Sequence, residues 1–293
     1  MILCLDIGGS KIAAGLVKSG RVFHFQKTKW QKPLTAKKII NQIIQIISGL
    51  KSKTLNLKSI AIGVAGQVDK KGEVFITRHL LGKRTKIALK KILEKKFKLP
   101  IYVENDAHCF ALAEAVLGQG KGKKFVIGLT LGSGIGGGII INQKIFGGKD
   151  GFAGEIGHTA IEAQGEKCSC GKKGCFEAHV SATALKKFYY QLTRKKVSGF
   201  EIDKLFRKKD KKAILAANKV ADYLAIGLGN IINIFNPEVI ILGGGLSRFK
   251  KLMEIAVART KLQTLIPNHQ TKILISKLGD NAQLLGASLL VKK

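Results

Sequence analysis

Three short apolar segments of this chain each run directly into a glycine-rich turn. Short apolar segments bounded by glycine are typical of buried strands. The three are Ile2–Asp6 before Gly8-Gly9, Phe125–Leu131 before the glycines of 132–138, and Val239–Leu242 before Gly243-Gly244-Gly245. Because glycine has no side chain, the backbone N–H groups of such turns can approach an anion closely. One turn alone is more often structural, but three in one chain favour phosphate binding.

The first two turns differ from the two best-known phosphate-binding motifs. Asp6–Lys11 and Gly132–Gly138 do not open a helix, as a dinucleotide fingerprint does. The Gly-Lys-Ser/Thr signature of a Walker loop does not occur in the sequence. Nucleotide binding of the Rossmann or P-loop type is therefore not expected.

The rest of the chain alternates strand and helix patterns, which predicts an α/β fold. Thr35–Leu50 and Lys86–Lys98 carry apolar residues at helical spacing, with lysines on the other faces of the second segment. The other expected elements are helices at Ala107–Leu117, Ala213–Phe235 and Arg248–Leu262, and strands at Ile12–Val17, Val22–Gln26, Ser59–Val64, Ile101–Val103, Gly137–Ile141 and Lys272–Ser276.

A strand, a glycine turn and a second strand occur in both halves of the chain. The glycine- and lysine-rich segment Gly118–Lys124 lies between the two occurrences and is typical of a domain boundary. The recurrence is one sign of a duplicated architecture.

Lysine dominates the charge of the chain. Its 293 residues hold 51 Lys and Arg against 19 Asp and Glu, a formal charge of +32. Such a balance is the electrostatic signature of a nucleic-acid-binding protein. However, only seven of the basic residues are arginines, the preferred readers of phosphate and base edges, and the lysines are spread over the whole sequence. We therefore expect most of them to form solvated surface, and the 45% hydrophobic content excludes a disordered basic tail.

No targeting or membrane segment is expected. The first residues form a strand pattern rather than a signal peptide, and the uncharged stretch 125–143 contains too many glycines for a stable membrane-spanning helix. The chain is thus predicted to be soluble and cytoplasmic, with reduced cysteines.

One histidine and three cysteines have the spacing of a metal site. His158 is followed by Cys168, Cys170 and Cys175, with glycines at 171 and 174 that permit tight turns. Three thiolates and one imidazole are the ligands of a closed, tetrahedral structural Zn²⁺ site. A chance cluster of inert cysteines and a redox pair are the weaker alternatives, and Cys4 and Cys109 are expected in the core.

The segment Glu104-Asn105-Asp106 lies where a strand ends and a helix begins. A carboxylate there can simply cap the helix. It can also act as a general base at the carboxyl end of a strand in an α/β crevice. Spacing alone does not separate these two roles.

Together these motifs resemble the ROK family of sugar kinases and related regulators. The matching segments are collinear: Asp6–Lys11, Gly63–Gly66, Glu104–Ala107, Leu131–Gly138, Gly154–His158, Cys168–Cys175 with Glu177, and Leu242–Gly245. The resemblance implies an actin-like, duplicated ribonuclease-H-like fold with ATP and sugar in a cleft between two domains. We expect residues 1–118, with a C-terminal helix at 280–293, as the smaller domain, and 119–279, with the zinc knuckle, as the larger.

The resemblance also implies roles for individual residues. Asp106 would be the base that deprotonates the attacking sugar hydroxyl, while Gly66, Asn105, Glu155, His158 and Glu177 would bind the sugar. His158 would in addition ligate zinc, together with Cys168, Cys170 and Cys175. ATP and its Mg²⁺ would be bound by Asp6, Gly8, Gly9, Ser10, Lys11, Gly132, Ser133, Gly134, Gly244 and Gly245.

The expected activity is ATP-dependent phosphorylation of a hexose. Glucose, converted to glucose 6-phosphate, is the first choice of substrate. N-acetylmannosamine, N-acetylglucosamine, fructose and allose stay open, because His79, His108 and Cys109 replace residues usual in glucokinase-like members. Repressors of the family carry an N-terminal helix-turn-helix domain, for which no room is expected here because the first strand starts at Ile2. The rival of another class is a non-enzymatic regulatory or nucleic-acid-binding protein, and the family leads us to expect a homodimer.

Overall fold

The computed structural model describes residues 1–76, 85–266 and 270–291. The chain divides into two compact units. Unit 1 comprises Met1–Lys124, Gly138–Gly154 and Lys277–Lys293, and unit 2 comprises Phe125–Gly137 and Glu155–Ser276. His79, which the sequence comparison singled out, lies outside the described residues.

The main sheet of unit 1 has five strands in the order β3-β2-β1-β4-β8. β1 pairs antiparallel with β2 and parallel with β4, so the first three strands form a meander and the last two enter through helical crossovers. The bounds are β1 Ile2–Ile7, β2 Lys11–Lys18, β3 Arg21–Lys29, β4 Ser59–Val64 and β8 Ile101–Asn105.

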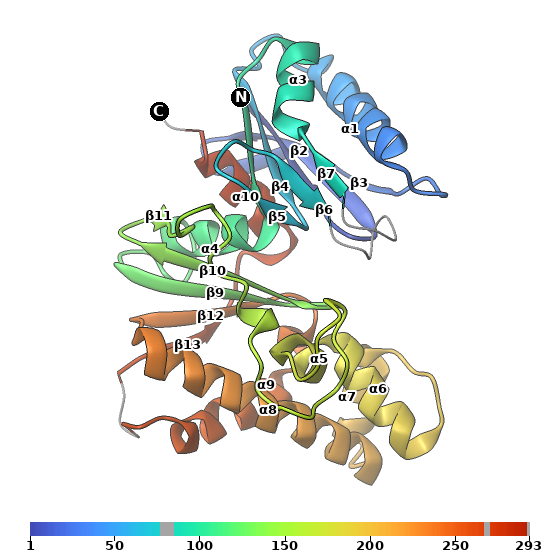
Figure 1. The fold of residues 1–293 in the computed structure, drawn as a ribbon, viewed down its shortest axis with the longest axis vertical. Helices are drawn as coiled ribbons and strands as arrows, with labels where there is room; N and C mark the ends of the chain where they lie inside the picture. The colour runs from blue at the N-terminus through green and yellow to red at the C-terminus, as the bar shows by residue number, and fades with distance from the viewer. Residues whose placement is uncertain (77–84, 267–269, 292–293) are drawn as a thin grey trace. The chain divides into compact units, whose positions relative to one another are not determined.

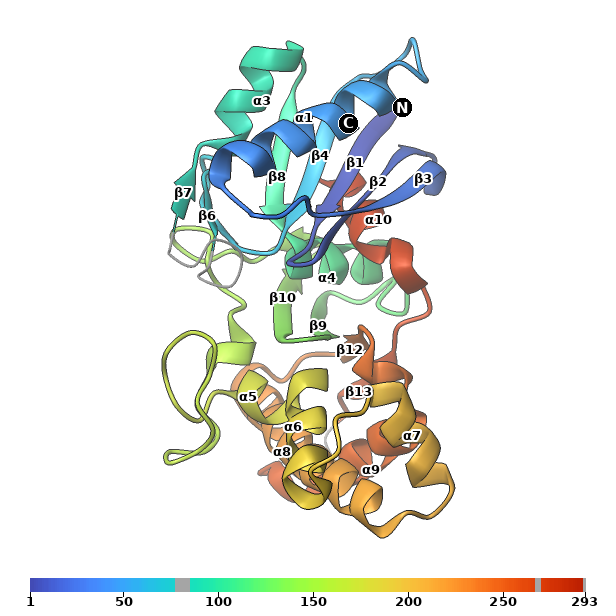
Figure 2. The same cartoon turned by 90° about the vertical axis from the view of Figure 1, so that its right-hand side faces the viewer.

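Helices cover both faces of this sheet (Figure 1, Figure 2). Alternate residues of β1 divide between the faces: Leu3 and Leu5 belong to the core with α1 and α3, and Cys4 to the core with α4 and α10. The helices are α1 Ala36–Lys51, α3 Leu89–Phe97, α4 Asp106–Val116 and α10 Ala282–Leu289. Gly286 lets the backbone of α10 contact the Cys109 carbonyl of α4, where any side chain would collide. α10 is thereby packed closely against α4, and both share a core with Cys4 of β1.

A small three-stranded sheet extends unit 1 beyond β4. It consists of β5 Gln67–Val68, β6 Val74–Ile76 and β7 Thr85–Ile87, in the order β5-β6-β7. The helix expected at Lys86–Lys98 begins only at Leu89, because Lys86 belongs to β7 and pairs with Phe75 of β6. Its predicted solvated face is confirmed: Leu93 and Phe97 are buried, whereas Lys91 and Lys95 are exposed.

The second main sheet repeats the strand order of the first. Its order is β11-β10-β9-β12-β13, with parallel pairs β9–β12 and β12–β13 and an antiparallel pair β10–β11. Each sheet thus has a three-stranded meander followed by two parallel strands, which confirms the duplication expected from the sequence. The bounds are β9 Phe125–Leu131, β10 Ile135–Ile141, β11 Lys144–Ile145, β12 Val239–Gly243 and β13 Lys272–Ile275.

Unit 2 contains five α-helices among the described residues (Figure 1). They are α5 Phe176–Val180, α6 Ala182–Thr193, α7 Gly199–Arg207, α8 Lys211–Phe235 and α9 Lys250–Thr260. Gly227 of α8 leaves space for the ring of Phe176, which fixes α5 and the knuckle before it. Across the described ranges, no helix combines the length and apolar character needed to cross a membrane.

Candidate functional site

The end of β1 carries the first set of predicted residues. Gly8 donates its N–H to the Lys11 carbonyl at 3.0 Å, which closes the tight turn into β2. The Gly8 carbonyl accepts a hydrogen bond of 2.9 Å from Nε1 of Trp30. Gly9 faces open space, while Ser10 and Lys11 are exposed. The turn is therefore held from behind and presents its tip to solvent, as an anion-binding turn must.

Asp6 precedes this turn and shares its electrostatic environment with Asp106. The pKa of Asp6 is raised to about 7, mainly by burial and in addition by the Asp106 charge, while Lys11 and Lys27 oppose the shift. Because β1, β4 and β8 are parallel, their carboxyl ends lie along one edge of the sheet. Asp6 and Asp106 both lie at this edge. Two carboxylates in such a position attract a divalent cation, which would relieve their repulsion.

Asn105 and Asp106 form the junction between β8 and α4. The Asn105 side chain caps the helix, accepting from the N–H groups of Ala107 and His108 at 2.9 and 3.1 Å. Its Nδ2 donates to the Gly66 carbonyl at 3.0 Å, which joins two of the predicted sugar-binding residues. Of the two residues, Asn105 caps the helix, and Asp106 occupies its first turn.

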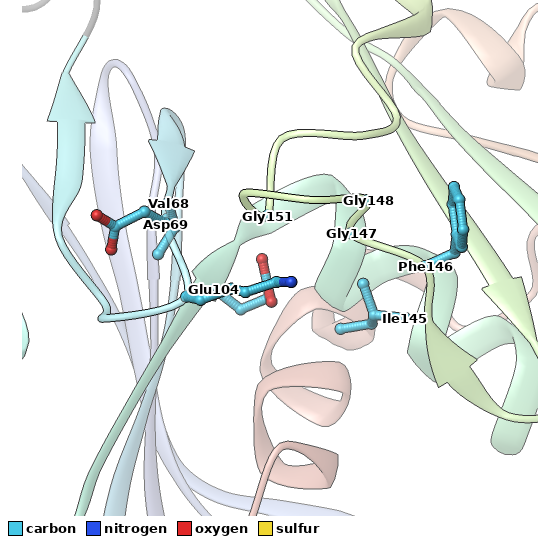
Figure 3. Close-up of a pocket in the computed structure, with 9 residues that line it drawn as sticks. Val68, Asp69, Glu104, Ile145, Phe146, Gly147, Gly148 and Gly151 are labelled. Carbon is cyan, nitrogen blue, oxygen red and sulfur yellow. The ribbon is translucent and has the colours of Figure 1, made fainter.

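A pocket of about 430 Å³ opens beside this junction, within unit 1 (Figure 3). Glu104 lines one side together with Val68 to Lys70, and residues 145–148 with Gly151 line the other. Motif analysis did not predict it, because its walls come from β5, β8 and the loop after β11. His108, which replaces a residue usual in glucokinase-like members, contacts both walls through Glu104 and the Ala153 carbonyl.

The second glycine turn lies in unit 2 between β9 and β10. Its Gly132 and Ser133 carbonyls accept from the Ala182 N–H and the Thr183 hydroxyl at the start of α6, both at 2.8 Å. One carboxylate oxygen of Glu177 accepts from the Ile135 N–H at 2.9 Å. A side chain at Gly134 would collide with the same carboxylate. Glu177 therefore holds this turn, a contact that the sequence did not reveal.

The short helix Ile156–His158 carries Glu155 and His158 at its ends. Glu155 is exposed, whereas Ile156 and Gly157 are buried. Any side chain at Gly157 would collide with the Ile135 carbonyl. The N–H of Ile135 binds Glu177 and its carbonyl packs on Gly157, so Glu177 and the helix that carries His158 converge on one residue.

The predicted knuckle is assembled. The donor atoms of His158, Cys168, Cys170 and Cys175 all lie within 4.8 Å of one another. The Cys170 and Cys175 sulfurs are 3.6 Å apart, and Cys168 Sγ is 3.6 Å from Nδ1 of His158. Tetrahedral zinc with sulfur ligands spaces those sulfurs on the order of 3.8 Å. The cluster fits a structural Zn²⁺ ion, with Nδ1 as the histidine ligand.

The electrostatics of the knuckle also suit a cation. The pKa of the Cys175 thiol is raised to about 12, first by burial and then by the neighbouring Cys170 and Cys168. Three thiolates at this spacing repel one another unless a cation lies between them. Ser169 also donates to Glu177 at 2.7 Å, so the knuckle and the glycine turn share one carboxylate.

The third glycine segment follows β12. Gly244 adopts a φ of +86°, and a side chain there would approach the Leu131 backbone within 2.6–2.8 Å, so only glycine fits. Its carbonyl accepts from the Ser247 hydroxyl at 2.8 Å. Gly245, by contrast, faces open space.

The sequence model of the ROK family matches residues 2–293. This chain belongs to the ROK family. Its fold also agrees with that family: a ROK family glucokinase from Streptomyces griseus, solved with glucose and AMPPNP, superposes with a TM-score of 0.87 at 31% identity over 99% of this chain and 98% of that one. The expected actin-like ATPase fold, a duplicated ribonuclease-H-like architecture, is confirmed.

ROK family members similar to this chain differ in function. The N-acetyl-D-glucosamine kinase of Photobacterium profundum is 31% identical over 98% of both chains. The xylose repressor of Bacillus spizizenii is 34% identical over 86% of this chain, but over only 66% of the repressor. Membership of the ROK family alone therefore does not decide between kinase and regulator.

Proposed function

We propose that this protein phosphorylates a hexose with ATP, converting glucose to glucose 6-phosphate. The observation that carries the proposal is the pair Asp6 and Asp106 at one edge of the first sheet, beside a glycine turn with an exposed tip. A regulator needs no such arrangement, whereas phosphoryl transfer needs a base, a cation site and a phosphate cradle.

Asp106 is the proposed general base. It takes the proton of the sugar hydroxyl as that oxygen bonds to the γ-phosphorus, while the bond between the γ-phosphorus and the bridging oxygen breaks and ADP departs. The capped start of α4 holds the carboxylate, whose Oδ1 accepts from the Ala107 N–H at 2.9 Å. Fixed geometry of this kind favours transfer to a single hydroxyl.

The proposed sugar-binding groups are those that the family resemblance implies. They are Asn105, the Gly66 loop, Glu155, His158 and Glu177. Carboxylates and an amide suit a polyol because they present fixed acceptors and donors. With Nδ1 of His158 toward the cysteines, Nε2 is the nitrogen left for a sugar hydroxyl.

The phosphates of ATP are proposed to bind at residues 8–11 and 132–134, with Gly244 and Gly245 against the adenosine. Asp6 would hold Mg²⁺, whose charge would neutralise the charge developing on the transferred group. Structural Zn²⁺ in the knuckle would keep His158 and Glu177 in place without entering the reaction.

The second candidate substrate is N-acetylglucosamine, favoured by the 31% identical kinase of Photobacterium profundum. N-acetylmannosamine and fructose kinases of the same family are further alternatives. A non-enzymatic, nucleic-acid-binding regulator is the rival class, favoured by the xylose repressor and by the charge of +32. We also expect the protein to be cytoplasmic and to form a homodimer. Light scattering measures the oligomeric state.

The test is ADP release, by a coupled assay with ATP and Mg²⁺, over a panel of glucose, N-acetylglucosamine, N-acetylmannosamine, fructose and allose. We expect the highest kcat/KM with glucose. A parallel titration with duplex DNA over a range of salt concentrations serves as the counter-test. Tight, salt-dependent DNA binding without turnover of any sugar would replace the kinase by the regulator.

A further inference from the structure

His108 is a buried imidazole that bridges two segments of unit 1. Only 3% of its surface is exposed. Nδ1 lies 2.9 Å from Oε1 of Glu104, one turn earlier in the chain, and Nε2 lies 2.7 Å from the carbonyl oxygen of Ala153. Both contacts are short, and they leave the ring from opposite edges.

Both ring nitrogens of His108 have a polar partner. A carbonyl oxygen can only accept, so Nε2 donates to Ala153. Nδ1 pairs with Oε1 of Glu104, which also accepts from the Asn105 N–H at 2.8 Å. Both edges of the ring are therefore engaged, one by the Glu104 carboxyl group and the other by the Ala153 carbonyl.

The two bridged segments are the two walls of the pocket. Glu104 lines one wall, and the loop ending at Ala153 forms the other through Gly147, Gly148 and Gly151. Figure 3 shows Glu104 facing this loop. The loop is closed on itself by the Ala153 N–H, which donates to the Gly147 carbonyl at 3.1 Å. Gly151 packs tightly against the Val68 backbone. His108 holds the loop two residues later, at Ala153.

The loop leads directly into a proposed sugar-binding residue. Glu155 lies two residues after Ala153, and Asn105 follows Glu104. One side chain thus fixes the backbone beside two groups that are proposed to bind the sugar.

We propose that His108 is a positioning residue for sugar recognition, which sets the shape of the pocket and the course of the 147–154 loop. This inference rests on the proposed kinase function. His108 touches no substrate; its hydrogen bonds hold Glu104 and Ala153 so that the neighbouring groups meet the sugar with their orientation fixed in advance. Loosening it weakens sugar binding and leaves ATP binding and the chemical step nearly unchanged.

The experiment compares two variants of the full-length protein with the wild type. His108→Phe keeps a ring of similar size without donors, and His108→Gln keeps one donor. His24→Gln, at an exposed position of β3, is the matched control. For each protein we measure KM for sugar and ATP, kcat, Tm, and hydrogen–deuterium exchange of peptides that cover residues 147–154.

We expect the KM for sugar to rise about 10-fold or more in His108→Phe and less in His108→Gln, since a buried hydrogen bond to a charged group is lost. The KM for ATP should stay within about twofold, and exchange in 147–154 should accelerate in the same order. The control should match the wild type. A lower Tm with unchanged sugar KM and unchanged exchange would overturn the inference.

The exchange measurement also separates this inference from the proposed function. If the wild type phosphorylates no sugar, the kinase proposal fails, yet exchange in 147–154 still reports whether His108 holds the loop. If the wild type is active and the exchange and sugar KM of both variants equal those of the wild type, only the role of His108 fails.

Discussion

The two main sheets of this protein each contain a hairpin with a glycine turn at an equivalent position. The two hairpins differ in the side chain that precedes the turn. Asp6 of β1 pairs with Gly63 of β4, and Thr130 of β9 pairs with Gly243 of β12. Each of these residues stands two positions before the first glycine of its turn. The first half therefore has a carboxylate where the second has a hydroxyl, which donates to the Gly136 carbonyl at 3.5 Å.

The two turns are also secured by different contacts. In the first, Trp30 holds the backbone from behind, and the tip is exposed. In the second, Glu177 and the start of α6 hold the turn, and Glu177 is tied to the knuckle. A duplicated scaffold can thus carry different groups at equivalent positions: a buried carboxylate before the turn in one copy, and a turn held by Glu177 beside the cysteine knuckle in the other.

The largest effect is expected from Asp106→Asn, in the half of the chain that contains Asp6. Without the base, kcat should fall by about 10²–10⁴-fold, while the Kd for ATP stays within about threefold. Stopped-assay kinetics and nucleotide titration measure the two effects. Glu254→Gln, on an exposed face of α9, is the control that should keep full activity. Unchanged turnover in Asp106→Asn would remove Asp106 from the mechanism.

The next test exchanges the residues that distinguish the hairpins. Asp6→Asn should lower kcat by about 100-fold, whereas Thr130→Val should change it by less than about threefold. Equal losses in both variants would mean that the two halves do not divide their roles as described.

The raised pKa of Asp6 predicts that the stability of the protein depends on pH. Because its pKa is raised to about 7, its contribution to stability is fully present below the unfolded pKa of about 4 and is lost as pH rises through 7. In metal-free protein, urea unfolding should thus show the wild type losing stability relative to Asp6→Asn between pH 5 and pH 8. A constant difference over that range would contradict the raised pKa.

The metal site proposed in the second half is tested by Cys170→Ser. The wild type should contain about one zinc per chain by elemental analysis, and the variant should lose it together with about 5–10 °C of Tm. Cys4→Ala, a change in the core of unit 1, should keep the zinc. Zinc retained in Cys170→Ser would argue that this thiol is not a ligand.

The smallest expected effect comes from a matched pair of glycines. Gly134→Ala should destabilise the protein by about 1–3 kcal/mol, because the added methyl group collides with Glu177. Gly9→Ala has open space and should stay within about 0.5 kcal/mol. Chemical denaturation measures both, and equal stabilities would mean that the second turn is not held as tightly as its contacts indicate.

Local features were predictable from the sequence because their determinants lie close together along the chain. The knuckle needs four ligands within 18 residues, and its donors meet as their spacing predicts. The helix expected at Thr35–Leu50 forms at Ala36–Lys51, with Thr35 as its cap. The strand predicted at Phe125–Leu131 has those bounds.

Features that depend on distant segments were not predictable. The strands of the small sheet, β5 to β7, are only two or three residues long, too short for an alternating pattern to emerge. The bond from Trp30 to Gly8 spans 22 residues, and that from His108 to Ala153 spans 45. The contact of Gly286 with Cys109 joins two residues that are 177 positions apart in the chain. Such pairs leave no periodic trace in the sequence.

The sequence by itself determined the α/β class, the strand-to-glycine turns and the knuckle, because each depends on local spacing. Tertiary structure decided what those residues touch. In the folded chain Asn105 caps α4, and Glu177 accepts a hydrogen bond from the second glycine turn. Burial and the Asp106 charge raise the pKa of Asp6. Burial and proximity belong to the packed chain, and they distinguish a carboxylate that braces a loop from one placed to bind a cation or take a proton.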